Sequence, residues 1–226
     1  VGNSTTNIIQ FTNTQTAFVT TSNIGVINSN PLHTISIGNG TFDPTVHLSG
    51  NVNILSTNSR VKVGSGSSTQ AASAISIGSS SGGTQGIAAI AVGQSSGGSQ
   101  SDRAVAIGSG AGQVQQFGAI AIGSSAGSTS QAANAVAIGT EAGLALQGDR
   151  SVAVGSNAGT DSQGVDAVAI GSNAASFNQG SESVAIGKDT AGGDRSVAIG
   201  PYAGSGDETV SMGFSAGHTG QGLHSV

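Results

Sequence analysis

One short motif recurs ten times along this chain of 226 residues and limits what the chain can fold into. Each copy has four residues that alternate between a small side chain and Val, Ile or Met, followed by glycine, as in Ala167-Val168-Ala169-Ile170-Gly171. Successive motif glycines are separated by 15, 15, 15, 16, 16, 16, 16, 13 and 13 residues: Gly78, Gly93, Gly108, Gly123, Gly139, Gly155, Gly171, Gly187, Gly200 and Gly213. A fixed period of this kind indicates one structural unit stacked on the next.

The alternation predicts a short β-strand with β-branched side chains on one face and very small ones on the other. Glycine ends the strand where a turn needs a positive φ or a close backbone approach. Chain direction repeats in every coil, so the stacked strands are expected to be parallel. The sequence therefore predicts an all-β fold, a parallel β-solenoid or β-roll with coils of 13–16 residues.

A variable polar stretch follows each motif, and all length differences between coils fall within it. We expect it to form an exposed loop on one side of each coil, and its Gln residues could stack their amides from coil to coil. Leu144, Leu146, Phe117 and Phe177 are apolar exceptions, which either plug gaps or touch a ligand. If the chain has a binding surface, the best candidates are these turns: Gln113–Gln116, Ser128–Gln131, Leu144–Gln147, Thr160–Gln163 and Ser176–Gln179.

Charged residues share one coil position, five residues before the motif glycine: Arg150, Asp166, Glu182, Arg195 and Glu208. Stacking would place Arg150 against Asp166, and Arg195 between Glu182 and Glu208. Exposed pairs of this kind stabilise a fold by about 0–1 kcal/mol each, so we expect them to help fix the register. Random surface charge is the alternative explanation.

Two apolar faces alternate along each strand, and one thin roll can enclose only one of them, so the other needs partner chains. We favour Val and Ile inside each roll and Ala and Ser toward the partners. On that assignment Ala169→Leu should disrupt assembly, and Ile170→Ala should unfold the coil. The repeat residues predicted to form the structural core are Val105, Ile107, Gly108, Ile120, Ile122, Gly123, Val136, Ile138, Gly139, Val152, Val154, Gly155, Val168, Ile170, Gly171, Val184, Ile186, Gly187, Val197, Ile199 and Gly200.

The units Arg103-Ala104-Val105-Ala106-Ile107-Gly108 and Ser183-Val184-Ala185-Ile186-Gly187 resemble the head repeats of trimeric autotransporter adhesins of the YadA-like type. They are also similar to repeats in fibre proteins of phages and large viruses. The resemblance covers about residues 72–226. It implies a left-handed parallel β-roll, three chains around a threefold axis, and a head that binds host matrix or cells.

Composition separates the chain into two expected parts. Residues 65–226 carry the repeats, and the last residues would open a further coil. Residues 1–64 are rich in Thr, Asn and Ser and are expected to form an irregular β connector or cap, with Phe11, Phe18 and Phe42 in a small core. Arg60 and Lys62 occupy motif positions that are small elsewhere. Because an unpaired buried charge is costly, that coil should lie at an open end.

We find no pattern of residues that predicts catalysis, a metal site or a cofactor. His33, His47, His218 and His224 do not have the spacing of metal ligands. The hexapeptide repeats of left-handed β-helix acyltransferases make coils of 18 residues, and the periods of 13, 15 and 16 found in this chain are not multiples of six. An ice-binding solenoid would need regular ranks of Thr on a flat face, whereas the ranks in this chain are Ala, Val and Ile. Six scattered bases and a net charge of −5 argue against nucleic acid, and no apolar run is long enough to insert in a membrane.

We therefore expect a non-enzymatic fibre or adhesin head that attaches to a host cell or matrix surface. The partners would be two further copies of the chain and a host surface protein, glycan or matrix. Its location would be extracellular, on the bacterial cell surface or outer membrane or on a virion. The alternative is a structural spacer of a viral fibre, or a capsid-associated component, with no ligand of its own.

Overall fold

The computed structural model describes residues 60–64, 69–204 and 206–217. These belong to the second of the two units into which the chain divides, Asn53–Val226. Most of the connector expected at 1–64, namely residues 1–59 with their three Phe residues, and all four histidines lie outside the described residues.

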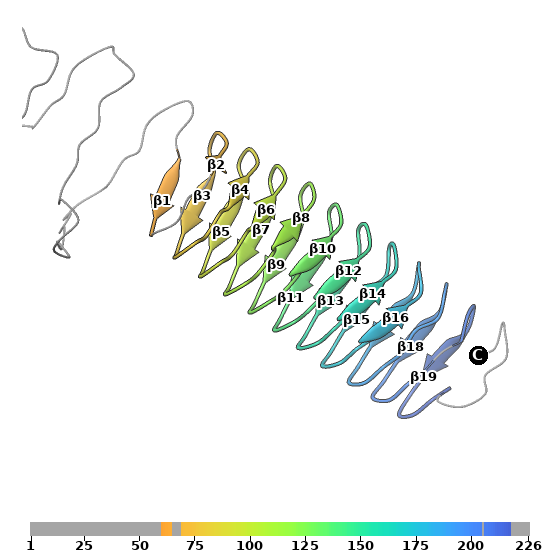
Figure 1. The fold of residues 1–226 in the computed structure, drawn as a ribbon. Coiled ribbons are helices and arrows are strands. Elements are labelled where there is room, and N and C mark those ends of the chain that lie inside the picture. The colour runs from red at the N-terminus through yellow and green to blue at the C-terminus, as the bar shows by residue number, and fades with distance from the viewer. Residues whose placement is uncertain (1–59, 65–68, 205, 218–226) are drawn as a thin grey trace, which may run out of the picture. The chain divides into compact units, whose positions relative to one another are not determined.

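All regular elements in the described ranges are β-strands, which form two parallel sheets (Figure 1). The first sheet has 11 strands in sequence order, β1 from the charged coil at residues 60–64 and one from each of the ten motifs: β1 (Val61–Val63), β3 (Ile75–Ile77), β5 (Ile90–Val92), β7 (Val105–Ile107), β9 (Ile120–Ile122), β11 (Val136–Ile138), β13 (Val152–Val154), β15 (Val168–Ile170), β17 (Val184–Ile186), β18 (Val197–Ile199) and β19 (Val210–Met212). Motif residues pair in register, so Ala153 lies beside Ala137 and Ala169. The predicted parallel β-solenoid is confirmed.

The second sheet has eight strands, formed by the variable stretches: β2 (Thr69–Gln70), β4 (Thr84–Gln85), β6 (Ser99–Gln100), β8 (Val114–Gln115), β10 (Thr129–Gln131), β12 (Ala145–Gln147), β14 (Asp161–Gln163) and β16 (Phe177–Gln179). The variable stretches are therefore strands, and the expectation of a simple exposed loop is wrong. The Gln that ends each of the strands from β4 onward is buried.

The differences in coil length arise in the second sheet. In the 16-residue coils one extra residue adopts a left-handed conformation, as at Ser162 with φ of 56°. Pairing resumes on either side of it, with Asp161 beside Phe177 and Gln163 beside Gln179. The neighbouring coil carries its own extra residue at the same place, Asn178 with φ of 47°, so the register between the two coils is kept. The 13-residue coils, by contrast, have no strand in the second sheet, which ends at β16.

The apolar part of the interior is made of alanine, and our assignment of the two faces is wrong. Ala153 and Ala169 are fully buried, whereas Ile170 on the same strand as Ala169 is 38% exposed. The buried core contains Ala106, Ala111, Ala121, Ala126, Ala137, Ala142, Ala153, Ala158, Ala169, Ala174, Ala175 and Ala185.

Beside the buried Gln side chains, the space at the alanine rank is too tight for Val or Ile, which is the physical reason for the reversal. A Cβ built on Gly112 would lie 2.8 Å from the Ala106 Cβ, and one on Gly159 would lie 3.3 Å from the Ala153 Cβ. Val or Ile cannot occupy a space where alanine faces glycine at these distances. The β-branched ranks therefore point outward.

The first strand bears out the expectation for the charged coil. β1 is the end strand of its sheet, where Lys62 pairs with Ser76 and is exposed. The sheet thus begins before residue 65.

Candidate functional surfaces

A buried ladder of glutamine amides forms one wall of the interior. Each Gln donates from Nε2 to a backbone carbonyl of the first sheet, as Gln163 does to the Val152 oxygen at 2.8 Å. Most also donate to the Oε1 of the next Gln, at 3.1 Å from Gln147 to Gln163 and from Gln163 to Gln179. The predicted stacking of amides is confirmed, and it ties both sheets and successive coils together.

Replacement of one amide in this ladder should be costly. In Gln163→Leu the Val152 oxygen, the Gln147 Nε2 donor and the Gln179 Oε1 acceptor all lose a buried partner. An unsatisfied buried group costs about 1–3 kcal/mol. We expect a clear fall in the urea midpoint, measured by circular dichroism. The same change at exposed Gln116 should shift the midpoint little, and equal shifts would contradict a structural role for the ladder.

The outer face of the 11-stranded sheet carries two continuous ranks of apolar side chains. The first rank is half-buried: Val105, Ile120, Val136, Val152, Val168, Val184 and Val197. In the second rank Ile107, Ile138 and Ile170 are 38% exposed. Its other members are half-buried: Ile122, Val154, Ile186 and Ile199. We call these two ranks the apolar strip.

Such a strip is unusual on the surface of a protein that works alone. Monomeric soluble proteins rarely expose contiguous apolar patches above a few hundred Å², and larger ones mark interaction sites. The sequence analysis placed these residues inside the roll and expected the Ala and Ser face to meet partner chains; in the structure the apolar face left outside is this strip.

The motif glycines of the predicted core stack directly on one another: Gly108, Gly123, Gly139, Gly155, Gly171, Gly187 and Gly200. Their φ values lie between 126° and 133°. A Cβ on Gly155 would lie 2.5 Å from the backbone oxygen of Gly171. Both sequence reasons for glycine, a positive φ and a close approach, apply here.

The predicted charge pairs form at one corner of the roll. Arg150 contacts Asp166, with Nε 2.6 Å from Oδ1, and Arg195 Nη2 lies 2.6 Å from Glu208 Oε1. The hydrogen bonds that Arg150 donates to the Asp166 carboxylate lower the pKa of Asp166 and raise the pKa of Arg150. Glu182 adds a weaker Coulombic attraction that helps raise the pKa of Arg195, after the hydrogen bond and charge of Glu208. The pairs are exposed, so they support the register of stacking more than stability.

The apolar exceptions in the variable stretches lie mostly on the outside. Phe177 is 73% exposed, Leu146 57% and Phe117 45%, whereas Leu144 is half-buried. The Arg103 guanidinium lies over the Phe117 ring, 5.2 Å from its centroid. Phe117, Leu146 and Phe177 therefore lie on the surface of the roll and do not fill gaps between coils. Leu144 is the exception.

Polar side chains pair between neighbouring coils at the turns that follow Gly139, Gly155, Gly171 and Gly187. Asn157 Nδ2 donates to Glu141 Oε2 at 3.0 Å, and Asn173 Nδ2 donates to Asp189 Oδ1 at 2.9 Å. Sequence reasoning missed these pairs, although the shared position two residues after each glycine was visible in the repeat alignment.

Metal-ligand clusters and membrane-spanning helices were both sought in the part of the chain that the structure describes. It contains no cluster of three acidic, His or Cys side chains suited to a metal ion. Within the same residues no helix has the length and hydropathy needed to cross a bilayer.

No known family model matches the chain, and no curated protein matches it significantly.

Proposed function

We propose that this chain is the head of a non-enzymatic homotrimeric fibre that attaches to a host cell or matrix surface. The observation that supports it best is the apolar strip, which extends along the roll from β7 to β18 and needs cover from other copies of the chain. The likeness of the motifs to adhesin and viral fibre heads supports three copies and an attachment role. On this proposal the chain works outside the cell, on a bacterial surface or a virion.

The assembly can be tested by the absolute mass in solution, from light scattering on a size-exclusion column. Three chains of 21.6 kDa amount to about 65 kDa. We expect the wild type at this mass, and Ile138→Asp near the mass of one chain with its β-structure kept, because a charge would enter the covered strip. Thr140→Asp, at an exposed turn position, is the matched control and should stay trimeric. A stable wild-type monomer would contradict the assembly.

Attachment itself needs a separate measurement. Beads coated with the trimer should bind to cultured cell monolayers or to deposited matrix, and soluble trimer should compete. A trimer whose beads bind no surface would favour the alternative, a structural spacer without a ligand.

A further inference from the structure

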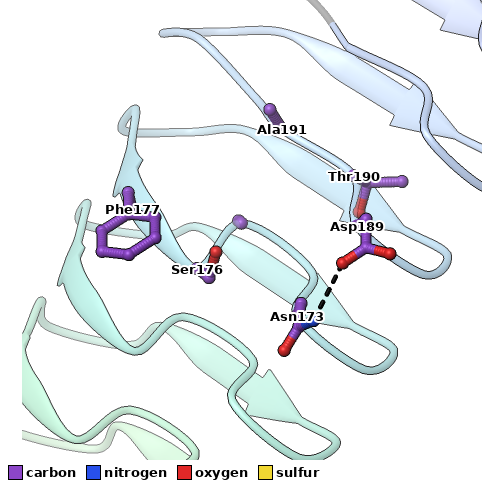
Figure 2. A pocket seen from close by; sticks show the side chains of 7 residues that line it. Asn173, Ser176, Phe177, Asp189, Thr190 and Ala191 are labelled. Carbon is purple, nitrogen blue, oxygen red and sulfur yellow. Dashed lines mark hydrogen bonds between the residues drawn. The ribbon is translucent and has the colours of Figure 1, made fainter.

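The end of the second sheet leaves a hollow beside β16. The next coils have 13 residues, and among the described residues no strand follows β16 in this sheet. The hollow has a volume of about 190 Å³ and is lined by Asn173, Ala175, Ser176, Phe177, Asp189, Thr190 and Ala191 (Figure 2). An adjoining hollow of about 380 Å³ shares Phe177 and the Asn173–Asp189 pair and adds Asn157 and Thr160.

The lining combines one aromatic ring with several amide, hydroxyl and carboxylate groups. Phe177 is 73% exposed, and Figure 2 shows Ser176 between it and the hydrogen-bonded Asn173 and Asp189. A carboxamide carries two donors and two acceptor lone pairs, and a carboxylate about four acceptor sites. Asn173 and Asp189 thus keep hydrogen-bonding capacity beyond the bond that joins them.

The charge in the hollow is largely offset. Asp189 accepts a hydrogen bond from Asn173, and Lys188 Nζ lies 3.6 Å from its Oδ2. A cationic ligand would have to compete with Lys188, so a neutral ligand rich in hydroxyl groups fits better. A sugar ring offers an apolar C–H face for an aromatic ring and hydroxyls for amide and carboxylate groups.

We propose that this hollow binds a neutral carbohydrate, one or two sugar rings in size. The inference rests on the proposed attachment function and assigns it a class of ligand. The volumes are at or below the lower part of the range of about 300–1,000 Å³ that holds drug-sized ligands. Phe177 lies on the second sheet and not on the strip, so the site stays open in the proposed assembly.

Saturation-transfer NMR on the assembled chain tests the site directly. The probes are the methyl glycosides of glucose, galactose, mannose and N-acetylglucosamine. We expect at least one to bind the wild type, with affinity that changes little with salt. Phe177→Ala should weaken that binding at least about tenfold, and Phe177→Tyr should retain it. Phe117→Ala removes another exposed ring in a different coil and should change nothing.

Three results would overturn the inference. The first is no binding of any of the four glycosides, and the second is equal binding by Phe177→Ala. The third is salt-sensitive binding of arginine ethyl ester, a cationic probe, in preference to the glycosides. Failure of the attachment function is distinguishable. Glycoside binding without attachment of coated beads would support the site and reject the function, whereas attachment without glycoside binding would reject this inference alone.

Discussion

Gly155→Ala should destabilise the roll strongly, and far more than Gly192→Ala does. The new Cβ would lie 2.5 Å from the backbone oxygen of Gly171, and neither backbone can yield without breaking the ladder. Alanine at φ of 130° is itself strained, since left-handed conformations cost about 1–2 kcal/mol. With the clash added, we expect a loss above about 3 kcal/mol, measured as a fall in the urea midpoint at fixed protein concentration.

Gly192→Ala is the matched control. Its Cβ would lie 3.5 Å from the Oγ atoms of Ser183 and Ser196 and 3.8 Å from the Ala185 Cβ, which are ordinary contacts. Reduced freedom of the unfolded chain should make this change neutral or stabilising by about 0.4–1 kcal/mol. If the two variants unfold at the same urea concentration, close glycine stacking is not what holds successive coils together.

Ala169→Leu should lower the thermal stability of the roll itself, whereas the sequence predicted that it would disrupt assembly. Ala169 is fully buried between Ala153 and Ala185 of the neighbouring coils. Overpacking of a well-packed core typically costs about 1–3 kcal/mol and occasionally more. We expect the upper part of that range, because buried Gln side chains and closely packed small residues leave no free space in the interior. The measurement is thermal unfolding followed by circular dichroism.

Two comparisons make this prediction decisive. Ala191→Leu adds the same atoms at an exposed position and should unfold close to the wild type. Ile170→Ala should keep the roll folded and lower the mass in solution, because Ile170 lies on the apolar strip. A folded Ala169→Leu monomer together with an unfolded Ile170→Ala would restore the original assignment of faces.

Much of the fold could be predicted because the repeat supplies it ten times over. The motif strands, their parallel stacking, the glycine turns and the Arg150–Asp166 and Arg195–Glu208 pairs all follow from aligning one coil on the next. Because the coils stack in register, residues at the same motif position form one row along the sheet. A local pattern is therefore enough to predict which residues become neighbours. The alignment also allowed amide stacking to be anticipated.

The candidate surfaces were less accessible from sequence. The sequence predicts loops at the turns proposed for ligand contact, but the structure makes them strands, each of which ends in a buried Gln. Burial of a polar ladder depends on carbonyls supplied by the opposite sheet, as Val152 does for Gln163. The hollow at Phe177 likewise depends on where the second sheet stops relative to a neighbouring turn.

The sequence alone determined the periodic strands and their register, because each is a property of one coil repeated. Only the tertiary structure decided which face is internal. Alternation along a strand distinguishes two faces but carries no information on the distance between sheets. Coils of 13–16 residues bring the walls so close that alanine meets glycine, and the larger Val and Ile side chains are left outside.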